Sequence, residues 1–369
     1  MSTAPRLTID LNALVQNWLF LKEKSGSAEC SAVIKANAYG LGIEPVATAL
    51  TKAGCKIFFV AMAEEGERVR VVSPNARIFI LNGIFADTME VITDNNLSPV
   101  LGNVDQVALW ATRGEGGSCA LHVDTGMNRL GMDVKEALQL AQNTSMLSRV
   151  NAKVLMSHLA CADDPNHEHN TLQHENFQKC VSKFSDLEHS FSNSAATLSR
   201  SDFHYDLTRP GIALYGGEAL NDVPNPMQPV VTAQSRILQI RHAKAGEKAG
   251  YGAEAELTRP TKIATISGGY ADGFHRALSG VGVPLRQATK TGANVWVNGY
   301  LAPILGRVSM DLITVDVTDV PDQTLEEAKW VEMFGKNIAV DDAARACGTI
   351  GYELLTSLGG RYVREYLNY

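Results

Sequence analysis

The chain has 369 residues, of which 45 % are hydrophobic and 20 % are charged. This composition is typical of a soluble globular protein and excludes disordered, collagen-like and coiled-coil classes. The length indicates two domains, or one large domain with an appendage. The formal net charge of −7 argues against nucleic acid or an anionic membrane as a general partner.

Six cysteines occur without a CxxC pair or a regular spacing, so the sequence predicts reduced thiols and neither a disulfide framework nor a zinc site. The N-terminus has no apolar stretch of signal-peptide length. The longest uninterrupted apolar run, Ile57–Ala63, is far below the roughly 20 residues that a membrane helix needs. We therefore expect a soluble, cytoplasmic protein.

In the first two thirds of the chain, short apolar runs alternate with amphipathic stretches of helical period. Eight of these runs are expected to be strands: Ala32–Lys35, Ile57–Ala61, Arg77–Leu81, Ser98–Leu101, Ala120–Val123, Ala152–Met156, Glu188–Ser192 and His204–Leu207. Eight strands separated by helices are typical of a (β/α)8 TIM-type barrel, which occupies about 250 residues. An open doubly wound sheet is the alternative, although no GxGxxG motif follows a strand to support it.

After about Val230 the pattern changes to strands joined by Gly- and Pro-rich turns. The strands expected there are Val231–His242, Lys262–Ser267, Asn294–Val297, Leu312–Val317 and Trp330–Phe334, with only two helical stretches, Ala339–Ala346 and Tyr352–Leu358. A proline-rich connection at Pro224–Pro229 separates the two patterns. The sequence thus predicts an α/β protein with a barrel over residues 1–229 and a mostly β domain over residues 230–369.

Active sites of such barrels lie at the C-terminal ends of the strands, so the residues there are the candidates for chemistry. The first expected strand ends in Lys35. Partial desolvation at a strand end would lower the pKa of this amine and suit it to Schiff-base chemistry. A surface lysine with a buried stem is the other interpretation of this position.

Four later strand ends carry further polar side chains: Arg129, His158, Asn193, Ser194 and Arg209. The loops after strands seven and eight of a barrel often bind phosphate. The Ser194 hydroxyl and backbone N–H groups near Gly211 and Ile212 suit that task. A phosphate site opposite a strand-end lysine suggests pyridoxal phosphate (PLP) bound to Lys35.

The segment Ala32–Gly42 (AVIKANAYGLG) resembles the PLP-binding signature of alanine racemases. Further matching motifs follow in the order of the family: Val123–Gly131 (VDTGMNRLG), Asn193–Ala196 (NSAA), Arg209–Gly216 (RPGIALYG), Gly250–Gly252 (GYG), Gly269–Gly273 (GYADG), Gly306–Asp311 (GRVSMD) and Thr349–Glu353 (TIGYE). The resemblance extends from Leu11 to the last residues. On these motifs the sequence is identified as a member of the alanine racemase family.

The resemblance implies PLP-dependent racemisation of L-alanine to D-alanine, a precursor of the bacterial cell wall. It also implies a homodimer, in which each active site forms between the barrel of one subunit and the β domain of the other. Lys35 would bind the cofactor covalently and act as the base on one face of the α-carbon. Tyr251 of the partner subunit would act on the opposite face.

The resemblance also assigns contacts to the remaining motif residues. The residues that match phosphate contacts are Tyr39, Ser194, Gly211, Ile212 and Tyr352, and the others assigned to the cofactor are Asn193, His158 and Arg209. Arg209 would face the pyridine nitrogen. Arg129 would contact the phenolic oxygen of the cofactor and the substrate carboxylate, for which its planar fork is suited. The backbone of Met310 would also touch the substrate.

One position departs from the family pattern. Many members have, at the position of His122, a lysine that becomes carbamylated and orients the arginine matching Arg129. Histidine cannot carry this modification in the same way. Either His122 hydrogen-bonds Arg129 differently, or a bound anion such as chloride takes the place of the carbamate.

Three other functions fit parts of the sequence. A non-enzymatic PLP carrier shares the barrel, but it lacks the β domain and any counterpart of Tyr251. Amino-acid decarboxylases of the same fold place a different substrate-binding apparatus in the second domain. A racemase of broader substrate range stays open, because the width of the pocket depends on loops.

Two polar segments receive structural interpretations. The run Cys161–His169 resembles a metal cluster by composition, but it has no helical spacing of histidines, so we expect no metal site. The resemblance makes it a loop near the active-site entrance. The charged run Glu64–Arg70 is expected to form the solvated face of a helix.

Overall fold

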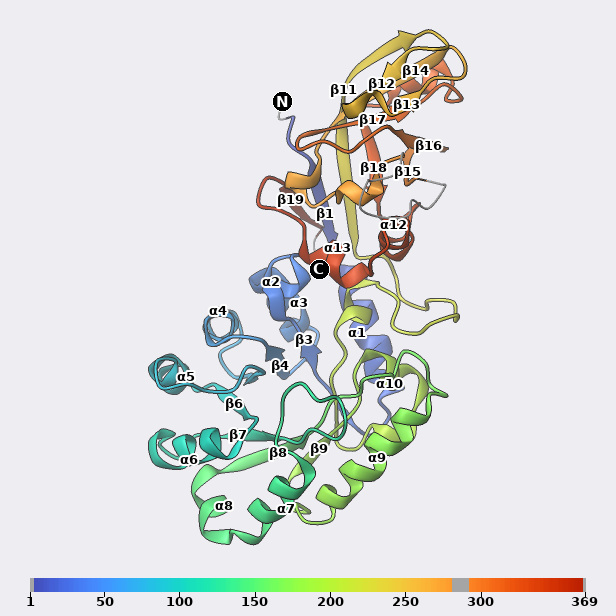
Figure 1. Ribbon diagram of the computed structural model, residues 1–369. Coiled ribbons are helices and arrows are strands. Elements are labelled where there is room, and N and C mark those ends of the chain that lie inside the picture. Colours follow the sequence, from blue (N-terminus) through green and yellow to red (C-terminus); the bar gives the residue numbers. More distant parts are fainter. Residues whose placement is uncertain (1–2, 281–291, 368–369) are drawn as a thin grey trace. The chain divides into compact units, whose positions relative to one another are not determined.

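The computed structural model of the chain describes residues 3–280 and 292–367 (Figure 1). The chain divides into two compact units. The barrel unit comprises Leu14–Leu214 and Glu218–Met227, and the β unit comprises the N-terminal segment through Ala13, Tyr215–Gly217 and the chain from Gln228 onward.

The barrel unit is built on short parallel strands that alternate with helices along the chain. Seven strands pair in the order β3-β4-β5-β6-β7-β8-β9, and β2 pairs with β10. Their bounds are β2 (Glu29–Cys30), β3 (Ala32–Val33), β4 (Ile57–Val60), β5 (Arg77–Ile80), β6 (Ser98–Leu101), β7 (Cys119–His122), β8 (Ala152–Met156), β9 (Glu188–Ser190) and β10 (Leu207–Thr208). Every residue of β4 and β6 is buried, as expected of parallel strands that are covered on both faces.

Backbone hydrogen bonds close these strands into a ring. Along one edge of β10 the bonds are Glu29 N–H to Asp206 O, Ser31 N–H to Thr208 O and Val33 N–H to Pro210 O, and along the other Asp206 N–H to His189 O and Arg209 N–H to Ser192 O. The segment of β2 and β3 is thereby joined to β10 on one side and to β4 on the other. The (β/α)8 barrel is therefore confirmed, and the open doubly wound sheet is excluded.

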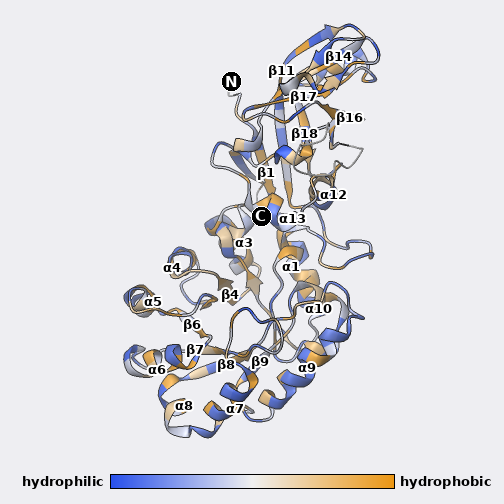
Figure 2. Ribbon diagram, in the orientation of Figure 1, coloured by the Kyte–Doolittle hydropathy of each residue, from blue (hydrophilic) through white to orange (hydrophobic). Residues whose placement is uncertain are grey.

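Helices surround the strands, and several begin at side-chain caps. Asn103, Asp133 and Asn193 each accept a backbone N–H of the helix that follows, which satisfies a donor that the helix itself leaves unpaired. The helices are α1 (Leu11–Lys24), α2 (Lys35–Tyr39), α3 (Ile43–Lys52), α4 (Ala63–Val72), α5 (Met89–Asp94), α6 (Val104–Arg113), α7 (Val134–Gln142), α8 (Thr144–Val150), α9 (Glu168–Val181), α10 (Ser194–Ser199), η1 (Ser201–Phe203) and η2 (Ile212–Tyr215). Figure 2 shows hydrophilic colour over much of α7, α8 and α9.

The core of the barrel unit comes from alternate residues of successive strands. Phe59, Phe79, Val100, Ala120 and Val154 belong to one cluster of buried side chains, and the rings of Phe59 and Phe79 stack with their centroids 4.8 Å apart. Burying one such large apolar side chain contributes about 1.5–3 kcal/mol. This packing makes the strands a rigid frame for the residues that follow their C-terminal ends.

The β unit contains one sheet of eight strands in the order β14-β17-β16-β15-β18-β11-β1-β19. The long strand β11 pairs with β1 and β18 through its first half and with β14 through its second half, which closes six of the strands into a ring. The strands are β1 (Arg6–Asp10), β11 (Val231–Ala243), β12 (Lys248–Ala249), β13 (Ala255–Glu256), β14 (Thr261–Ser267), β15 (Asn294–Val297), β16 (Tyr300–Leu305), β17 (Leu312–Asp316), β18 (Trp330–Phe334) and β19 (Val363–Leu367). The helices are α11 (Asp322–Glu327), α12 (Val340–Ala346), α13 (Gly351–Thr356), η3 (Tyr251–Ala253), η4 (Tyr270–Asp272) and η5 (Arg276–Leu278).

The mostly β character expected of the C-terminal part is confirmed, and three details differ from expectation. The eighth barrel strand is Leu207–Thr208 and not His204–Leu207, because η1 and the turn after it occupy the preceding residues. The expectation of only two helices was wrong, since Asp322–Glu327 forms a third that buries Leu325. The division at residue 229 placed the first residues in the barrel, whereas β1 pairs with β11 and β19 of the β unit.

All six cysteines are free thiols. Within the described residues, no helix combines the length and the apolarity that crossing a membrane requires.

Candidate active site

Lys35 follows β3 and begins an unusual turn. The next four residues, Ala36–Tyr39, all have left-handed backbone, with φ between 53° and 55°. This conformation costs about 1–2 kcal/mol for each residue other than glycine, so the turn has to be held by its surroundings. Burial lowers the pKa of the Lys35 amine, and the positive charge of Arg129 lowers it further, which favours a reactive amine.

Tyr39, Ser194 and Gly211 meet where the first and last strands end. The Gly211 N–H donates to Ser194 Oγ at 2.7 Å, and the Ala213 N–H lies 3.5 Å from the same oxygen. A Cβ at Gly211 would overlap Tyr39 Oη. Only glycine therefore leaves this point open, and the groups around it are two hydroxyls and backbone N–H groups, which a phosphate requires as donors.

The group formed by Tyr39, Ser194 and Gly211, here called the cradle, is supported by two neighbouring motif residues. Asn193 caps α10, and its Oδ1 accepts the Ala196 N–H at 3.1 Å. Ile212 is buried and begins η2. Both residues fix the backbone that carries Ser194 and Gly211.

Arg209 is a buried arginine that has no carboxylate partner among the described residues. Its guanidinium donates to Ser190 Oγ and to Ser157 O, each at 2.5 Å. Burial lowers its pKa to about 9, so the group stays charged at neutral pH. A buried charge that meets only neutral partners favours a further acceptor, and a ligand atom can supply it.

His122 and His158 lie at the ends of β7 and β8. Burial lowers the pKa of His122 to about 4, and the charge of Arg209 acts in the same direction. Burial and the charges of Arg209 and Arg129 hold the pKa of His158 well below its usual range. Both rings are therefore neutral at pH 7, and no hydrogen bond joins the rings to Arg129 in the described part of the chain.

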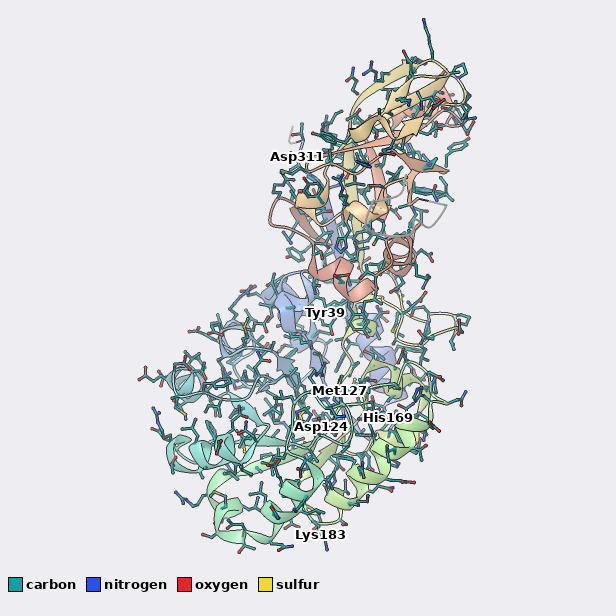
Figure 3. All side chains as sticks on the ribbon, viewed as in Figure 1. Tyr39, Asp124, Met127, His169, Lys183 and Asp311 are labelled. Atoms are coloured by element: carbon teal, nitrogen blue, oxygen red, sulfur yellow. The ribbon has the colours of Figure 1, made fainter. Side chains whose placement is uncertain are left out.

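Arg129 lies in a loop that Asp124 organises. The Asp124 carboxylate accepts the N–H groups of Gly126, Met127 and Arg129 at 2.8, 2.9 and 3.0 Å. His169 Nε2 lies 3.0 Å from Gly126 O, and Figure 3 shows Asp124, Met127 and His169 close together. The Arg129 side chain is exposed, so the loop backbone is fixed while the guanidinium is available to an anion.

In the β unit, Tyr251 begins η3 in a turn bounded by two glycines with φ of 76°, Gly250 and Gly252. Arg307 lies behind this turn, because a Cβ at Gly252 would be 3.0 Å from Arg307 Nη1. Arg307 is in turn bound to Glu254 at 2.7 Å. The Tyr251 side chain is 67 % exposed, so this fixed turn presents its phenol away from the core of the unit.

Met310 lies in a turn that is held from one side. The Ala271 N–H donates to Met310 O at 3.2 Å, and a Cβ at Gly269 would overlap that same oxygen. The side chain of Met310 is 52 % exposed. The backbone of Met310 is thus fixed by close packing while its outer face stays open.

Arg361 stabilises the same turn from a distant part of the sequence. It donates to the buried Asp272 at 2.8 and 2.6 Å and to Asp311 at 2.7 Å. Asp311 is labelled in Figure 3 within the β unit. Tyr352, the remaining expected cofactor contact, lies in α13 and is exposed.

The structure brings the barrel residues of the expected site into one electrostatic environment. Lys35, Arg129 and Arg209 each act on the pKa of His158, and Gly211 joins Ser194 to Tyr39. Asp124 acts on the pKa of His122, and Glu65 acts on that of Lys35, each in the direction opposite to the cations. A lysine with a depressed pKa, a cluster of hydroxyl and backbone N–H groups and several cations fit PLP, so the fold and the site define a PLP-binding barrel enzyme.

Two contributors to the site were not found from the sequence. Ser190 binds Arg209 from inside β9, and nothing in the sequence signals this role. Glu65 lies in the run Glu64–Arg70 that we expected to be solvated, which was wrong for this residue, because its side chain is buried. Its place as the third residue of α4, where a carboxylate caps the helix start, was the available signal.

The segment Cys161–His169 has a structural role in the described chain. Asp163 accepts the side-chain and backbone N–H groups of Asn221 at 2.8 and 2.9 Å, and Asn170 donates to the backbone of Cys161 and Asp164. Nowhere in residues 3–280 and 292–367 do three or more His, Cys, Asp or Glu side chains form a group that could hold a metal ion.

The chain is similar to known proteins over its whole length. Residues 9–219 match the family described as alanine racemase, N-terminal domain, and residues 230–366 match alanine racemase, C-terminal domain. The biosynthetic alanine racemase of Agrobacterium fabrum is 50 % identical, over 98 % of this chain and 93 % of that protein. The alanine racemase of Rhizobium meliloti is 48 % identical, over 100 % and 98 %.

A solved structure is similar as well. The alanine racemase of Bartonella henselae with covalently bound PLP superposes with a TM-score of 0.91 and 38 % identity, covering 99 % of this chain and 100 % of that one. The chain belongs to the alanine racemase family. The family, the fold and the enzyme class expected from the sequence are thereby confirmed.

Gly211→Ala should weaken the binding of PLP, because the added Cβ overlaps Tyr39 Oη. Overpacking of this kind costs about 1–3 kcal/mol, so we expect the dissociation constant of PLP to rise about tenfold or more. Titration of the cofactor-free protein with PLP measures it. Gly360→Ala is the matched control, since a Cβ there meets nothing within 4 Å. Equal PLP affinity in the two variants would refute the prediction that the cradle binds the phosphate of PLP.

The depressed pKa of His122 predicts a loss of stability in acid. Between its ordinary pKa of 6.5 and its folded value of about 4, the unfolded chain binds a proton at this residue that the native protein does not. The free energy of unfolding therefore decreases as the pH falls, by about 2 kcal/mol at pH 5 from this group.

In the cofactor-free protein, the free energy of unfolding falls between pH 7 and pH 5, and His122→Gln should remove the part of this fall that His122 causes. Urea unfolding at the two pH values measures it. The exposed His242 provides the control, and His242→Gln should follow the unsubstituted protein. A His122→Gln variant that loses stability in acid as steeply as the unsubstituted protein would contradict the assignment.

Proposed function

We propose that this protein interconverts L-alanine and D-alanine with PLP bound to Lys35, and that it supplies D-alanine for peptidoglycan in the cytoplasm. The observation that carries the proposal is the position of Lys35, with its depressed pKa, on the same turn as the Tyr39 phenol of the phosphate cradle. The names of the relatives support the substrate. PLP, when bound, withdraws electrons from the α-carbon of the amino acid and so acidifies its proton.

Two groups are needed to exchange that proton, because one base that returns it to the same face changes nothing. Lys35 acts on one face, where burial and the charge of Arg129 keep its amine available. Tyr251 acts on the other face. Its exposure and its rigid glycine-bounded turn support a role outside the core of its own unit.

Arg209 moderates the cofactor. A guanidinium that stays protonated next to the pyridine nitrogen leaves that nitrogen without a proton. Arg209 would thereby make the bound cofactor a weaker electron acceptor than a carboxylate at the same place would. The bonds of Arg209 to Ser190 and Ser157 hold the guanidinium in one orientation for this task.

The other expected residues bind the cofactor and orient the substrate. The phosphate is held by Tyr39, Ser194, Gly211, Ile212 and Tyr352, with Asn193 and His158 beside the cofactor. Arg129 receives the substrate carboxylate as a planar fork, and the backbone of Met310 contacts the substrate. Among the described residues, the Met310 N–H has no hydrogen-bond partner, and it belongs to a turn fixed by Ala271 and Gly269.

The protein acts as a homodimer in which the partner contributes the β-unit residues. The support for this is that Tyr251 and Met310 are exposed on fixed turns of the β unit, while the cationic cluster belongs to the barrel unit. Each chain thus carries the barrel part of one site and the β-unit part of another. Two copies can combine these parts into two complete sites, as an isologous dimer requires.

Incubation of the protein with PLP and L-alanine in heavy water tests the activity and both bases. Conversion to D-alanine with deuterium at the α-carbon is the expected result, and unchanged L-alanine would refute the proposal. A panel of serine, lysine and arginine then decides between alanine and a broader substrate range.

The two bases are separated by substitution in the same assay. Lys35→Ala should lose the absorbance of the lysine-bound cofactor together with racemisation. Tyr251→Phe should keep that absorbance and lose deuterium exchange mainly from one enantiomer. Near-normal exchange from both enantiomers would exclude Tyr251 as a base.

Mixing the two inactive variants tests the shared site. In a heterodimer of Lys35→Ala and Tyr251→Phe chains, one of the two sites contains an intact Lys35 and an intact Tyr251. Random exchange of subunits should therefore restore roughly a quarter of the activity of the unsubstituted enzyme. No recovery, with subunit exchange shown by differently tagged chains, would mean that each site is built from a single chain.

A further inference from the structure

The left-handed turn Ala36–Tyr39 connects the two residues whose spacing the cofactor site depends on. Lys35 precedes the turn, and Tyr39 ends it against Gly211. Neither alanine nor tyrosine favours left-handed backbone. The bonds within the segment, Ala38 N–H to Ile34 O at 2.9 Å and Gly40 N–H to Ala36 O at 2.8 Å, close the turn but leave the N–H of Asn37 to another partner.

That partner is Glu65. One of its carboxylate oxygens, Oε1, accepts the Asn37 N–H at 2.9 Å. The other, Oε2, accepts the Ala61 N–H at 2.9 Å and lies 3.4 Å from the Met62 N–H. Glu65 is 6 % exposed, so this charge is buried and its bonds to the backbone are correspondingly strong.

Glu65 thus joins the ends of two barrel strands through one rigid group. The Ala61 and Met62 N–H groups belong to the turn between β4 and α4, and that of Asn37 belongs to the turn after β3. A carboxylate can accept at both oxygens, whereas a side-chain amide has one accepting oxygen and an NH2 group that only donates. The negative charge is required by this geometry, because three N–H groups point at the two oxygens.

A second contact holds the same turn from outside. Asn37 Oδ1 accepts the Ile43 N–H at 3.2 Å and Arg68 Nη2 at 2.8 Å. Arg68 is itself fixed by Glu44, at 2.6 and 2.8 Å. These side chains are more exposed than Glu65, so we expect their contribution to be smaller.

Resting on the function proposed above, we propose that Glu65 is a positioning residue for the cofactor site. Its buried carboxylate holds the Asn37 backbone in the left-handed conformation and so sets the positions of Lys35 and Tyr39. The negative charge of Glu65 also raises the pKa of Lys35, against the larger effects of burial and of Arg129. Glu65 touches neither the cofactor nor the substrate in this role.

Glu65→Gln should therefore weaken PLP binding with little change elsewhere. One of the carboxylate's backbone partners then faces an amide N–H, and we expect the dissociation constant of PLP to rise about tenfold. The turnover number should fall, while the KM for alanine stays within about twofold because Arg129 and Met310 are unaffected. The measurements are titration by the absorbance of the lysine-bound cofactor and racemisation kinetics at saturating PLP.

The matched control is Glu64→Gln, which removes the same charge from the adjacent exposed position of α4. Thermal unfolding of the cofactor-free variants reports their stability. PLP affinity of Glu65→Gln equal to that of Glu64→Gln would overturn the proposal.

A compensating change distinguishes positioning from general stability. Ala36 is exposed and left-handed, so Ala36→Gly removes strain from the turn without opening a cavity. When it is added to Glu65→Gln, the affinity for PLP should rise about threefold or more above that of Glu65→Gln alone. Loss of affinity that Ala36→Gly leaves unimproved would overturn the role of the turn.

If Glu65→Gln does not fold, Arg68→Ala takes its place in the same pair of experiments. It removes the outer contact to Asn37 and should weaken PLP binding about two- to fivefold, again with recovery by Ala36→Gly. Unchanged PLP affinity in Arg68→Ala would then count against the proposal.

Lys35→Ala, run in parallel, keeps the two proposals separate. If it retains the absorbance of a lysine-bound cofactor, the proposed function is wrong. If it loses that absorbance while Glu65→Gln binds PLP normally, only the role of Glu65 is wrong.

Discussion

The closure of the barrel is the constraint on which the site depends. The bond from Val33 N–H to Pro210 O, at 2.9 Å, places the end of the first strand beside the end of the last one. Lys35 follows on one side of this seam and Gly211 on the other, although they are far apart in the sequence. The cradle of Tyr39, Ser194 and Gly211 exists only because the ring is closed, since an open sheet would leave these two strands at opposite edges.

Three cations, Lys35, Arg129 and Arg209, act together at the C-terminal ends of the barrel strands. Arg209 is buried against a hydroxyl and a carbonyl, and two histidines are kept neutral by burial and by the arginines. Such an arrangement opposes folding, because each uncompensated charge is costly to bury. An anionic ligand that bound beside these groups would reverse that effect and stabilise the folded protein.

Much of the fold and of the site could be predicted from the sequence, because the relevant signals are local. Apolar runs marked the strands of the barrel, and strand-end residues such as Lys35 and Arg209 marked the candidate site, where the roles of the residues stay a prediction. The pairing of β1 with β11 and β19 could not be predicted. It joins segments more than two hundred residues apart, and the sequence pattern of a strand does not indicate which other strand it pairs with. Glu65 was hidden for a different reason. Its neighbours in the run are exposed, and only the turn after β3, packed against it, makes this one carboxylate an interior group.

Left-handed backbone flanks both residues that we propose as bases. Ala36–Tyr39 are left-handed beside Lys35, and Gly250, Gly252 and Ala253 have positive φ around Tyr251. At Tyr251 the two glycines indicate left-handed backbone, because glycine adopts it without steric cost. At Lys35 the sequence offers alanine, asparagine and tyrosine, and the conformation is imposed from outside by hydrogen bonds to Asn37. Strain that the local sequence does not favour persists only where the surrounding structure over-determines it. The lysine side, where none of the four residues is glycine, therefore depends more on buried supporting groups than the tyrosine side, where two of the three residues are glycines.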